Sequence, residues 1–518
     1  MQTLDHVARL PGHDAATHKP VLRNKRLDRA LTRVSDAPLR NGNQLTLLHN
    51  GSETYTDWLD AIGRAQHWVH LENYIFQDDG IGQRFAEALA ERAAAGVRVR
   101  VLYDWFGSLD VSGAFWRKLR RSGVDVRAFN PLAVTSPFDV IHRDHRKLLA
   151  VDGTYASIGG VCIADPWLDT SPVTGLPYRD TAVRVLGPAL ADIERAFADI
   201  WRHNGTPLPP DELVPLNSLS AAGDVLARVV VQEPERMRML RVFQVMLAAV
   251  ERRVWIADAY FLAAPILREA LLAAARDGID VRILLPSTND LPLVGAMSRY
   301  GYQPLIEAGV QIWEYAGLMM HAKTTVADGW WSRVGSTNLN ITGLQTNWEI
   351  DLIAEDQAFG AAMEKMYEHD LAHAREIRLS GKRRLRPRPI RPESRAERQA
   401  RRHRSDSSVK ASLAMARVGA AIQTAGSETL KNNDRTISAV AGAALVSLAL
   451  LIARWPRLLA WPLALVSGLL GGVSLSRAIA RSPNVARGFT HRRAGFRPEA
   501  WRLKRRRPRG RNRRLDIG

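Results

Sequence analysis

An internal duplication is the feature that most constrains how this chain of 518 residues can fold. The pattern His-x-Lys-x4-Asp-x6-Gly occurs at residues 145–159 and returns at 321–335. The segments before it also return in the same order, at offsets between 176 and 186 residues. The paired segments are 68–76 with 254–261, 96–102 with 278–284, and 123–126 with 309–312. A repeat of this length indicates a duplicated folding unit, so we expect two similar lobes.

Each copy alternates strand-like and helix-like segments. Residues 97–102 alternate apolar and charged side chains as a strand does, and residues 85–94 before them have a helical pattern. Strands that alternate with helices favour an α/β layer architecture. We therefore expect an α/β fold with two duplicated α/β/α lobes, residues 41–205 and 206–375, related by a pseudo-twofold axis.

Each motif brings an imidazole and an ammonium group together. Residues two apart on a strand point the same way, so His321 and Lys323 should share one face, as should His145 and Lys147. An imidazole can attack or move a proton, and a lysine can hold an oxyanion. Two such pairs at one cleft would supply everything that phosphodiester cleavage needs, without a metal or another cofactor.

The glycine-rich segments after the two motifs differ. Ser336 and Asn338 follow the second motif, whereas Gly160 and Cys162 stand at the same places after the first. An amide donates a good hydrogen bond to a phosphate oxygen, and a thiol donates a weak one. We expect Gly160, Ser336 and Asn338 to contact the substrate phosphate, with the stronger contacts in the second copy.

The duplicated pattern resembles that of the phospholipase D superfamily, and its flanks are most similar to those of bacterial cardiolipin synthases. The resemblance covers roughly residues 40–370. The flanking stretches that carry it are Leu71–Phe76, Asp144–Lys147, Arg179–Thr181 and Gly187–Pro188.

The resemblance implies a role for each motif residue. His145 would attack phosphorus and form a phosphohistidine, while His321 would protonate the leaving alcohol and then deprotonate the acceptor. The reverse assignment of the two histidines stays open. Lys147 and Lys323 would neutralise the phosphate oxygens.

Four carboxylates complete the expected catalytic set. The resemblance places Glu349 beside the histidine of the first copy and Asp180 beside that of the second. Each would then fix the tautomer of the imidazole it faces. The alternative is that both are surface carboxylates in ordinary loops. Asp152 and Asp328 belong to the motifs, but each precedes a glycine, which favours support of a turn over direct proton transfer.

The net charge of +19 is concentrated near the C-terminus. Residues 378–404 carry about +10 and residues 484–518 about +11, which leaves the rest of the chain near −2. The two lobes are therefore not expected to be basic as a whole. The single cysteine, Cys162, excludes an intramolecular disulfide. Residues 1–40 are expected to form a polar leader without a cleaved secretory signal.

Beyond the lobes, the composition predicts a membrane attachment. Each of two apolar arms has about 17–18 residues, close to the minimum for crossing a hydrocarbon core of roughly 30 Å. Trp455 and Trp461 lie either side of Pro456, as at an interfacial turn. The expected segments are an Arg/Pro linker at 376–408, a helical segment at 409–435, an apolar hairpin at 436–476 and a basic tail at 477–518. A pair of buried helices in a soluble domain and a re-entrant hairpin are the alternatives.

The hairpin and its basic flanks favour a lipid substrate, because anionic leaflets attract Lys and Arg. We expect a phosphatidyltransferase that moves a phosphatidyl group from phosphatidylglycerol to the alcohol of a second phospholipid. Its partners would be anionic phospholipids (phosphatidylglycerol and cardiolipin) and the membrane. We expect it at the cell inner membrane, with the lobes on the cytoplasmic side.

Three alternative functions remain, and the oligomeric state stays open. A hydrolytic phospholipase D would differ only in that water takes the intermediate. A nucleic-acid phosphodiesterase would use the basic segments to bind phosphates, but such arms need no apolar hairpin. A membrane scaffold without activity is disfavoured because both motifs are intact.

Overall fold

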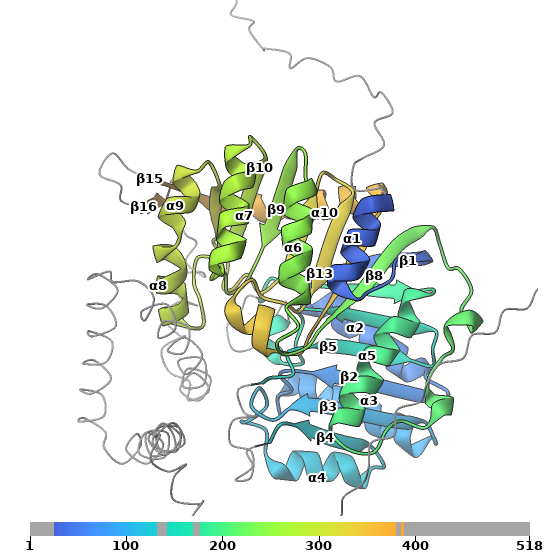
Figure 1. Ribbon diagram of the computed structural model, residues 1–518. Helices are drawn as coiled ribbons and strands as arrows, with labels where there is room; N and C mark the ends of the chain where they lie inside the picture. Colours follow the sequence, from blue (N-terminus) through green and yellow to red (C-terminus); the bar gives the residue numbers. More distant parts are fainter. Residues whose placement is uncertain (1–24, 132–141, 169–176, 380–384, 388–518) are drawn as a thin grey trace, which may run out of the picture. The chain divides into compact units, whose positions relative to one another are not determined.

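The computed structural model describes residues 25–131, 142–168, 177–379 and 385–387 (Figure 1). Residues 1–24 of the predicted leader lie outside the described residues. So do the predicted helical segment 409–435, the hairpin 436–476 and the basic tail 477–518.

The first lobe follows the predicted alternation of strands and helices. Its elements are β1 (Arg40–His49), α2 (Asn50–Arg64), β2 (Trp68–Asn73), α3 (Gly80–Ala94), β3 (Arg98–Asp104), α4 (Gly113–Arg121), β4 (Asp125–Phe129), β5 (Lys147–Val151), β6 (Tyr155–Gly159), β7 (Thr181–Leu186) and α5 (Ala189–His203).

The second lobe repeats this order. Its elements are β8 (Val225–Gln232), α6 (Arg238–Ala249), β9 (Arg253–Ala257), α7 (Pro265–Arg276), β10 (Asp280–Pro286), α8 (Pro292–Tyr300), α9 (Tyr302–Glu307), β11 (Gln311–Tyr315), β12 (Thr324–Ala327), β13 (Trp331–Gly335), β14 (Glu349–Glu355) and α10 (Gln357–Ala372). The pair α8 and α9 stands where the first lobe has α4.

The strand order shows how the two copies are joined. Outward from the centre, the first lobe runs β1-β7-β6-β5-β2-β3-β4 and the second runs β8-β14-β13-β12-β9-β10-β11. The antiparallel ladder between β1 and β8 connects them, with Arg40 opposite Ala227. Within each lobe the three outermost of these strands are parallel and the others antiparallel. This inverted repetition is the arrangement that a pseudo-twofold relation between the lobes requires.

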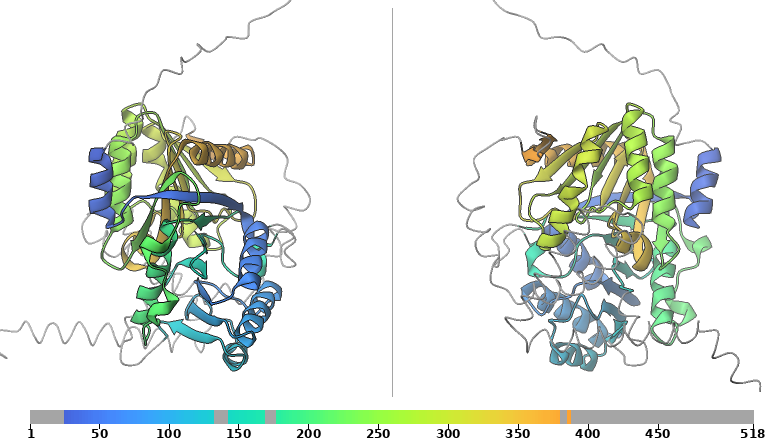
Figure 2. Two further views of the ribbon diagram at one scale, coloured as in Figure 1. Left: turned by 90° about the vertical axis from the view of Figure 1, so that its right-hand side faces the viewer. Right: turned by 60° about the vertical axis from the view of Figure 1, so that its left-hand side comes forward.

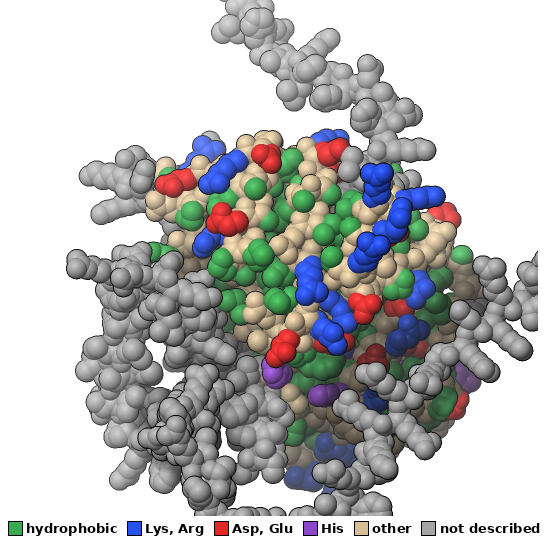
Figure 3. All heavy atoms as spheres, viewed as in Figure 1, with side chains coloured by type: hydrophobic (Ala, Val, Ile, Leu, Met, Phe, Trp, Pro, Cys, Tyr) green, Lys and Arg blue, Asp and Glu red, His purple; other side chains and the backbone are tan. Residues whose placement is uncertain are grey.

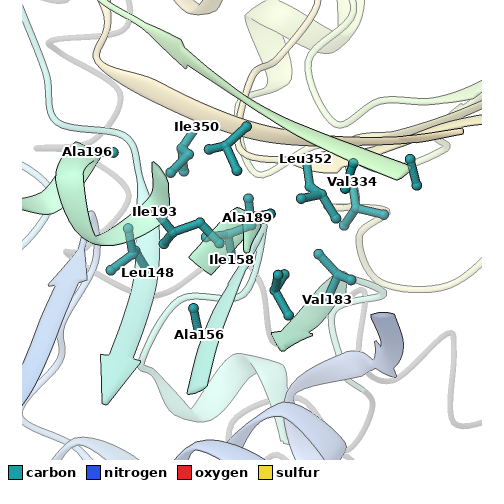
Figure 4. Close-up of a cluster of buried hydrophobic side chains, with 14 of the residues drawn as sticks. Leu148, Ala156, Ile158, Val183, Ala189, Ile193, Ala196, Val334, Ile350 and Leu352 are labelled. Carbon is teal, nitrogen blue, oxygen red and sulfur yellow. The ribbon is translucent and has the colours of Figure 1, made fainter. Parts of the chain in front are cut away.

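The central strands are buried on both faces, which explains their almost continuous apolar sequence. In β5, Leu148 and Ala150 face a core shared by the two lobes, while Leu149 and Val151 face the outer helices of the first lobe. The shared core combines α5 with strands of both lobes (Figure 4). Its labelled residues are Leu148, Ala156, Ile158, Val183, Ala189, Ile193, Ala196, Val334, Ile350 and Leu352.

Part of the predicted leader is ordered. Helix α1 (Lys25–Ser35) packs beside α6 of the second lobe (Figure 2), with Leu31 fully buried. Its partner Arg228 on β8 donates to Asp28 at 2.6 Å. The sequence did not indicate this helix because its apolar face is short. The side chains of Arg29 and Arg33 on this helix are exposed. Figure 3 shows Lys and Arg side chains gathered over the α1 edge.

The predicted linker also begins with regular structure. Strand β15 (Ala374–Leu379) pairs with the edge strand β11, and β16 (Leu385–Pro387) pairs with β15. Ala374 and Ile377 are buried in this extension of the sheet. The basic composition concealed the strand, because its two buried apolar side chains are three residues apart and so do not show the alternation of a strand.

Within the described ranges, no helix has both the length and the apolar character that crossing a bilayer requires.

Candidate active site

Both motifs lie at the carboxyl ends of parallel strands, the usual place for sites in α/β sheets. Lys147, the first residue of β5, is paired with Asn73, the last residue of β2. His145 and His321 precede β5 and β12 rather than lying inside them, so the prediction that a strand carries each histidine is wrong in this detail.

The segment around each histidine is bound to the opposite lobe, which explains why its own strand starts later. The His145 amide donates to the Trp348 carbonyl at 2.9 Å, and the Trp348 amide donates to the Arg143 carbonyl at 2.8 Å. In the other motif, the His321 amide donates to the Arg179 carbonyl at 2.7 Å. Backbone hydrogen bonds therefore fix each histidine against the segment that carries its carboxylate.

Glu349 of the second lobe faces His145 of the first. Nδ1 of His145 lies 2.9 Å from Oε2 of Glu349. The same carboxylate accepts from Ser336 Oγ at 2.5 Å and from Asn347 Nδ2 at 3.2 Å. Burial raises the pKa of Glu349 to about 8, against the opposing charge of Lys147. This pair therefore holds a proton at neutral pH.

Asp180 of the first lobe faces His321 of the second, so the two pairs cross as expected from the sequence. Nδ1 of His321 lies 2.6 Å from Oδ2 of Asp180, which also accepts from Trp167 Nε1 at 2.8 Å. Burial would raise the pKa of Asp180, but His321 and Lys323 together lower it to about 2. Burial and the charge of Lys323 lower the pKa of His321 to about 4.

Both motif lysines are fully buried beside their histidines. Lys147 Nζ donates to the His145 carbonyl at 2.5 Å, and Lys323 Nζ donates to the His321 carbonyl. Each ammonium group also lies near an aromatic ring: Lys147 is 5.0 Å from the Tyr74 ring centre and Lys323 is 5.9 Å from that of Tyr260. Burial lowers the pKa of Lys323 to about 8, against the opposing effect of Asp180.

The two motif aspartates do not reach the histidines. Each has a positive φ in a turn and accepts three backbone amides: Asp152 from residues 66–68 and Asp328 from residues 251–253. Asp152 lies at the opposite end of β5 from Lys147, about 16 Å away at ~3.3 Å per residue. This geometry favours the turn-supporting role of both aspartates over direct proton transfer, and that role stays a prediction.

The expected phosphate-binding residues occupy unequal positions. A Cβ at Gly160 would lie 2.1 Å from Asp180 Oδ1, so a side chain there would displace this carboxylate. Ser336, at the same place in the second lobe, donates to Glu349. Asn338 is buried, and its Oδ1 has no hydrogen-bond partner among the described residues. Cys162 is fully buried, and burial raises the pKa of its thiol.

Asn73 is a site residue that the sequence reasoning missed. It lies directly opposite Lys147, is 1% exposed, and neither atom of its amide has a partner within the described part of the chain. The ladder between β9 and β12 pairs Ala257 with Thr324, and one further step places Asp258 opposite Lys323. Asn73, and not Glu72, is therefore the counterpart of Asp258.

Asp258 differs from Asn73 because its carboxylate oxygens accept hydrogen bonds. Asp258 accepts from the Leu339 amide at 2.8 Å and from the Tyr260 amide at 3.0 Å. Burial raises the pKa of Asp258 to about 6, against the opposing charge of Lys323. The second-lobe lysine thus faces a carboxyl group, and the first-lobe lysine faces a neutral amide.

Aromatic rings surround His321. Trp167 meets the imidazole edge-on at 5.2 Å, and Tyr260 does so at 6.0 Å. The duplication could not have revealed Trp167, because the corresponding position of the second copy, at the 176-residue offset of the motifs, is Gly343. In the described segments, no group of three or more His, Cys, Asp or Glu residues is arranged to hold a metal ion.

A family model described as "Cardiolipin synthase, PLD-like domain" matches residues 58–166 and 244–371. The cardiolipin synthase of Halalkalibacterium halodurans is 31% identical over 361 residues, which cover 68% of this chain and 71% of that protein. Cardiolipin synthase A of Pseudomonas syringae pv. syringae is 34% identical over 352 residues, covering 67% and 73%.

A solved structure has the same fold. The crystal structure of phosphatidylserine synthase from Haemophilus influenzae Rd KW20 superimposes with a TM-score of 0.55 and 16% identity, covering 68% of this chain and 92% of that one. At this identity the likeness concerns the fold, a pair of phospholipase D-like α/β lobes.

Proposed function

Since the chain belongs to the cardiolipin synthase family of phospholipase D-like enzymes and is a phosphatidyltransferase, we propose that it works in two half-reactions across the His145–His321 site. The donor is phosphatidylglycerol and the acceptor is the alcohol of a second phospholipid. The observation that supports this most is the crossed pairing of each histidine with a carboxylate of the opposite lobe. Such pairing fixes Nδ1 and leaves Nε2 to react.

In the first half-reaction, the Glu349–His145 pair first releases the proton that it holds in the empty site, and Nε2 of His145 then attacks the phosphorus of phosphatidylglycerol. The new P–N bond forms as the P–O bond to the glycerol headgroup breaks. His321 gives its proton to the leaving alkoxide, so glycerol departs neutral. Lys147 and Lys323 hold the non-bridging oxygens as negative charge grows on them.

In the second half-reaction, the hydroxyl of the acceptor lipid attacks the phosphohistidine. His321 takes the hydroxyl proton, the new P–O bond forms and the P–N bond to His145 breaks. Cardiolipin is the product and both histidines return to their starting states. We assign no metal or other cofactor to this chemistry.

The protonation states of His321 and of the Glu349–His145 pair affect which histidine can act as the acid. With a pKa of about 4, His321 is neutral in the empty site and must gain a proton to act as the acid. A bound phosphodiester supplies negative charge beside it, and a nearby opposite charge raises the pKa of an imidazole. The same low pKa favours the reverse assignment, in which His321 attacks and the proton-holding Glu349–His145 pair supplies the acid.

We also propose that the enzyme works at the cell inner membrane with its lobes on the cytoplasmic side. The apolar sequence of residues 436–476 and the basic segments on both sides of it support this assignment. Anionic phospholipids are then both substrates and the surface to which the protein binds. Nucleic acid is not a proposed partner.

The test uses full-length protein in detergent with phosphatidylglycerol labelled in its acyl chains, in the presence of EDTA. Cardiolipin together with glycerol is expected. Phosphatidic acid as the sole product would indicate a hydrolase, and a requirement for a divalent ion would exclude the proposed chemistry.

Trapping the intermediate tests the assignment of the histidines. In His321→Ala, a donor with a good leaving group needs no acid. Peptide from a reaction quenched in SDS at neutral pH, where the P–N bond survives, should therefore carry the phosphatidyl group on His145. The opposite result would be that His321 carries the label in the His145→Ala variant and that His145 carries none in the His321→Ala variant. This result would reverse the roles of the two histidines.

A further inference from the structure

A cavity of about 280 Å³ opens in the second lobe, at the carboxyl ends of β9 and β10. We call it the α8 cavity, because residues of helix α8 (located in Figure 1) form one wall. It is lined by Ala259, Phe261, Pro286, Ser287, Thr288, Asn289, Gly295, Ala296, Ser298, Arg299 and Tyr302. At ~30 Å³ per water molecule, this volume is large enough for a glycerol-sized group.

The first lobe fills the corresponding space with an aromatic side chain. A shift of 182 residues aligns the sequence Gly-Ala-Phe-Trp-Arg at 113–117 with Gly-Ala-Met-Ser-Arg at 295–299. In the first lobe Trp116 is buried, stacks on Tyr103 at 3.8 Å and meets Phe76 at 5.4 Å. In this alignment Ser298 corresponds to Trp116, so the second lobe lacks the indole that is buried in the first.

The lining of the α8 cavity suits a neutral group with several hydroxyls. Ser287, Thr288, Asn289 and Ser298 contribute hydroxyl and amide groups. Among the described lining residues, the one charged side chain is Arg299, and Glu314 engages it through two hydrogen bonds at 2.7 and 2.9 Å. Because this guanidinium is already neutralised, the cavity is not a site for a phosphate.

The cavity wall is attached to the catalytic histidine through Tyr260. This residue stands between the lining residues Ala259 and Phe261, and its ring meets His321 edge-on at 6.0 Å. Its hydroxyl lies 2.9 Å from Asp290 Oδ1, and the neighbouring Asn289 donates to the Ala259 carbonyl at 3.3 Å. The cavity therefore adjoins the segment that packs against His321.

We propose that the α8 cavity binds the glycerol headgroup from which His321 removes a proton. This inference rests on the proposed function, in which His321 is the base for the acceptor hydroxyl. The acceptor oxygen forms its bond to phosphorus as the P–N bond to His145 breaks, and the proton passes to His321. Since the first half-reaction is the reverse of this step, the same cavity holds the leaving glycerol of phosphatidylglycerol.

A site built to hydrogen-bond hydroxyls distinguishes a polyol from water as acceptor. The test therefore measures a product ratio, which does not depend on how much of each variant is active. Full-length enzyme receives phosphatidylethanol as donor and free glycerol as acceptor. Transfer yields phosphatidylglycerol, and attack by water yields phosphatidic acid.

Ser298→Trp restores the first-lobe residue and should fill the cavity. We expect the ratio of phosphatidylglycerol to phosphatidic acid to fall at least tenfold, with phosphatidylethanol still consumed. Met297→Phe is the matched control, because it makes the adjacent change towards the first-lobe sequence at a residue that does not line the cavity. It should leave the ratio unchanged.

Ala296→Leu fills the same space from another position and should lower the ratio if Ser298→Trp fails to fold. Ratios within twofold of wild type in the folded cavity-filling variants would overturn the inference. Wild-type enzyme that produces no cardiolipin from phosphatidylglycerol would instead overturn the proposed function.

Discussion

Nδ1 of His145 lies 2.9 Å from Oε2 of Glu349, a residue 204 positions further along the chain. The opposite pair, His321 and Asp180, repeats this crossing at 2.6 Å. Each lobe therefore supplies the carboxylate that orients the histidine of the other. Neither lobe alone therefore contains a complete His–carboxylate pair.

If the two histidines act in turn on one intermediate, losing either should stop the reaction. His145→Ala and His321→Ala should each lower the rate of cardiolipin formation by at least about 10³-fold, and the double variant should lose little more. The measurement is turnover of labelled phosphatidylglycerol by full-length protein. A single variant that kept most of its activity would contradict a shared site.

The motif aspartates should affect stability and not chemistry. Asp152→Ala removes the acceptor for three backbone amides and should lower the free energy of unfolding by about 2 kcal/mol. Asp152→Asn should cost less, because asparagine tolerates the positive φ of this turn. Urea denaturation measures the loss of stability. Turnover per folded molecule should stay unchanged, and a large fall in it would restore the catalytic assignment.

The sequence could predict the crossed pairs because the resemblance to a known family supplied them. It could not predict the register between the copies, since aligning 68–76 with 254–261 from their first residues sets Glu72 against Asp258, where the residue types agree. The strand ladders instead make Asn73 the counterpart of Asp258, one position away. Matching residue types thus found the duplicated strand but misplaced one functional side chain.

Three other features could not be predicted from the duplication, because the two copies do not share them. Trp167 contacts Asp180 from a segment that the second copy does not share. Helix α1 has only a short apolar face, and its burial depends on α6, more than 200 residues away. The sequence shows Ser298 where the first lobe has Trp116, but only the folded chain shows that a cavity lies beside it.

A substitution at Asn73 tests whether the positive charge of Lys147 must stay available to the substrate phosphate. Asn73→Asp would place a carboxylate opposite Lys147, as Asp258 stands opposite Lys323. The new ion pair would withdraw positive charge from the substrate phosphate, so kcat/KM for phosphatidylglycerol should fall by about tenfold or more. Asn73→Ala, which removes the amide without adding charge, should have the smaller effect. Equal activity of Asn73→Asp and wild type would contradict this account.

The pKa of Glu349 predicts how stability depends on pH. Folding raises it from 4.5 to about 8, so the folded protein binds this proton more tightly than the unfolded chain does. The contribution is fully present below pH 4.5 and is lost as the pH rises through 8. Urea midpoints of wild type should therefore fall between pH 6.5 and 8.5, and Glu349→Gln should reduce that fall.

Asp180→Asn is the control for this measurement. The pKa of Asp180 is about 2 in the folded protein against 3.8 for an ordinary aspartate, so its contribution is complete above about pH 4 and is lost below. This variant should keep the wild-type slope between pH 6.5 and 8.5. The same slope in Glu349→Gln as in wild type would show that Glu349 does not hold the proton.

The last prediction separates binding of the bilayer from chemistry. A chain that ends at Pro387 keeps every described strand, both histidines and both crossed carboxylates, but loses the apolar segment 436–476 and the basic tail. It should convert short-chain phosphatidylglycerol in mixed micelles at a rate close to that of the full chain. Its binding to anionic vesicles should fall sharply, because hydrophobic anchoring and most of the attraction of Lys and Arg to the leaflet are lost together. Co-sedimentation at low and moderate salt measures this loss, with neutral vesicles as the control for charge. Full-length protein that ignores vesicles would refute the membrane assignment, and a shortened chain that cleaves oligonucleotides but not phospholipid would refute the lipid function.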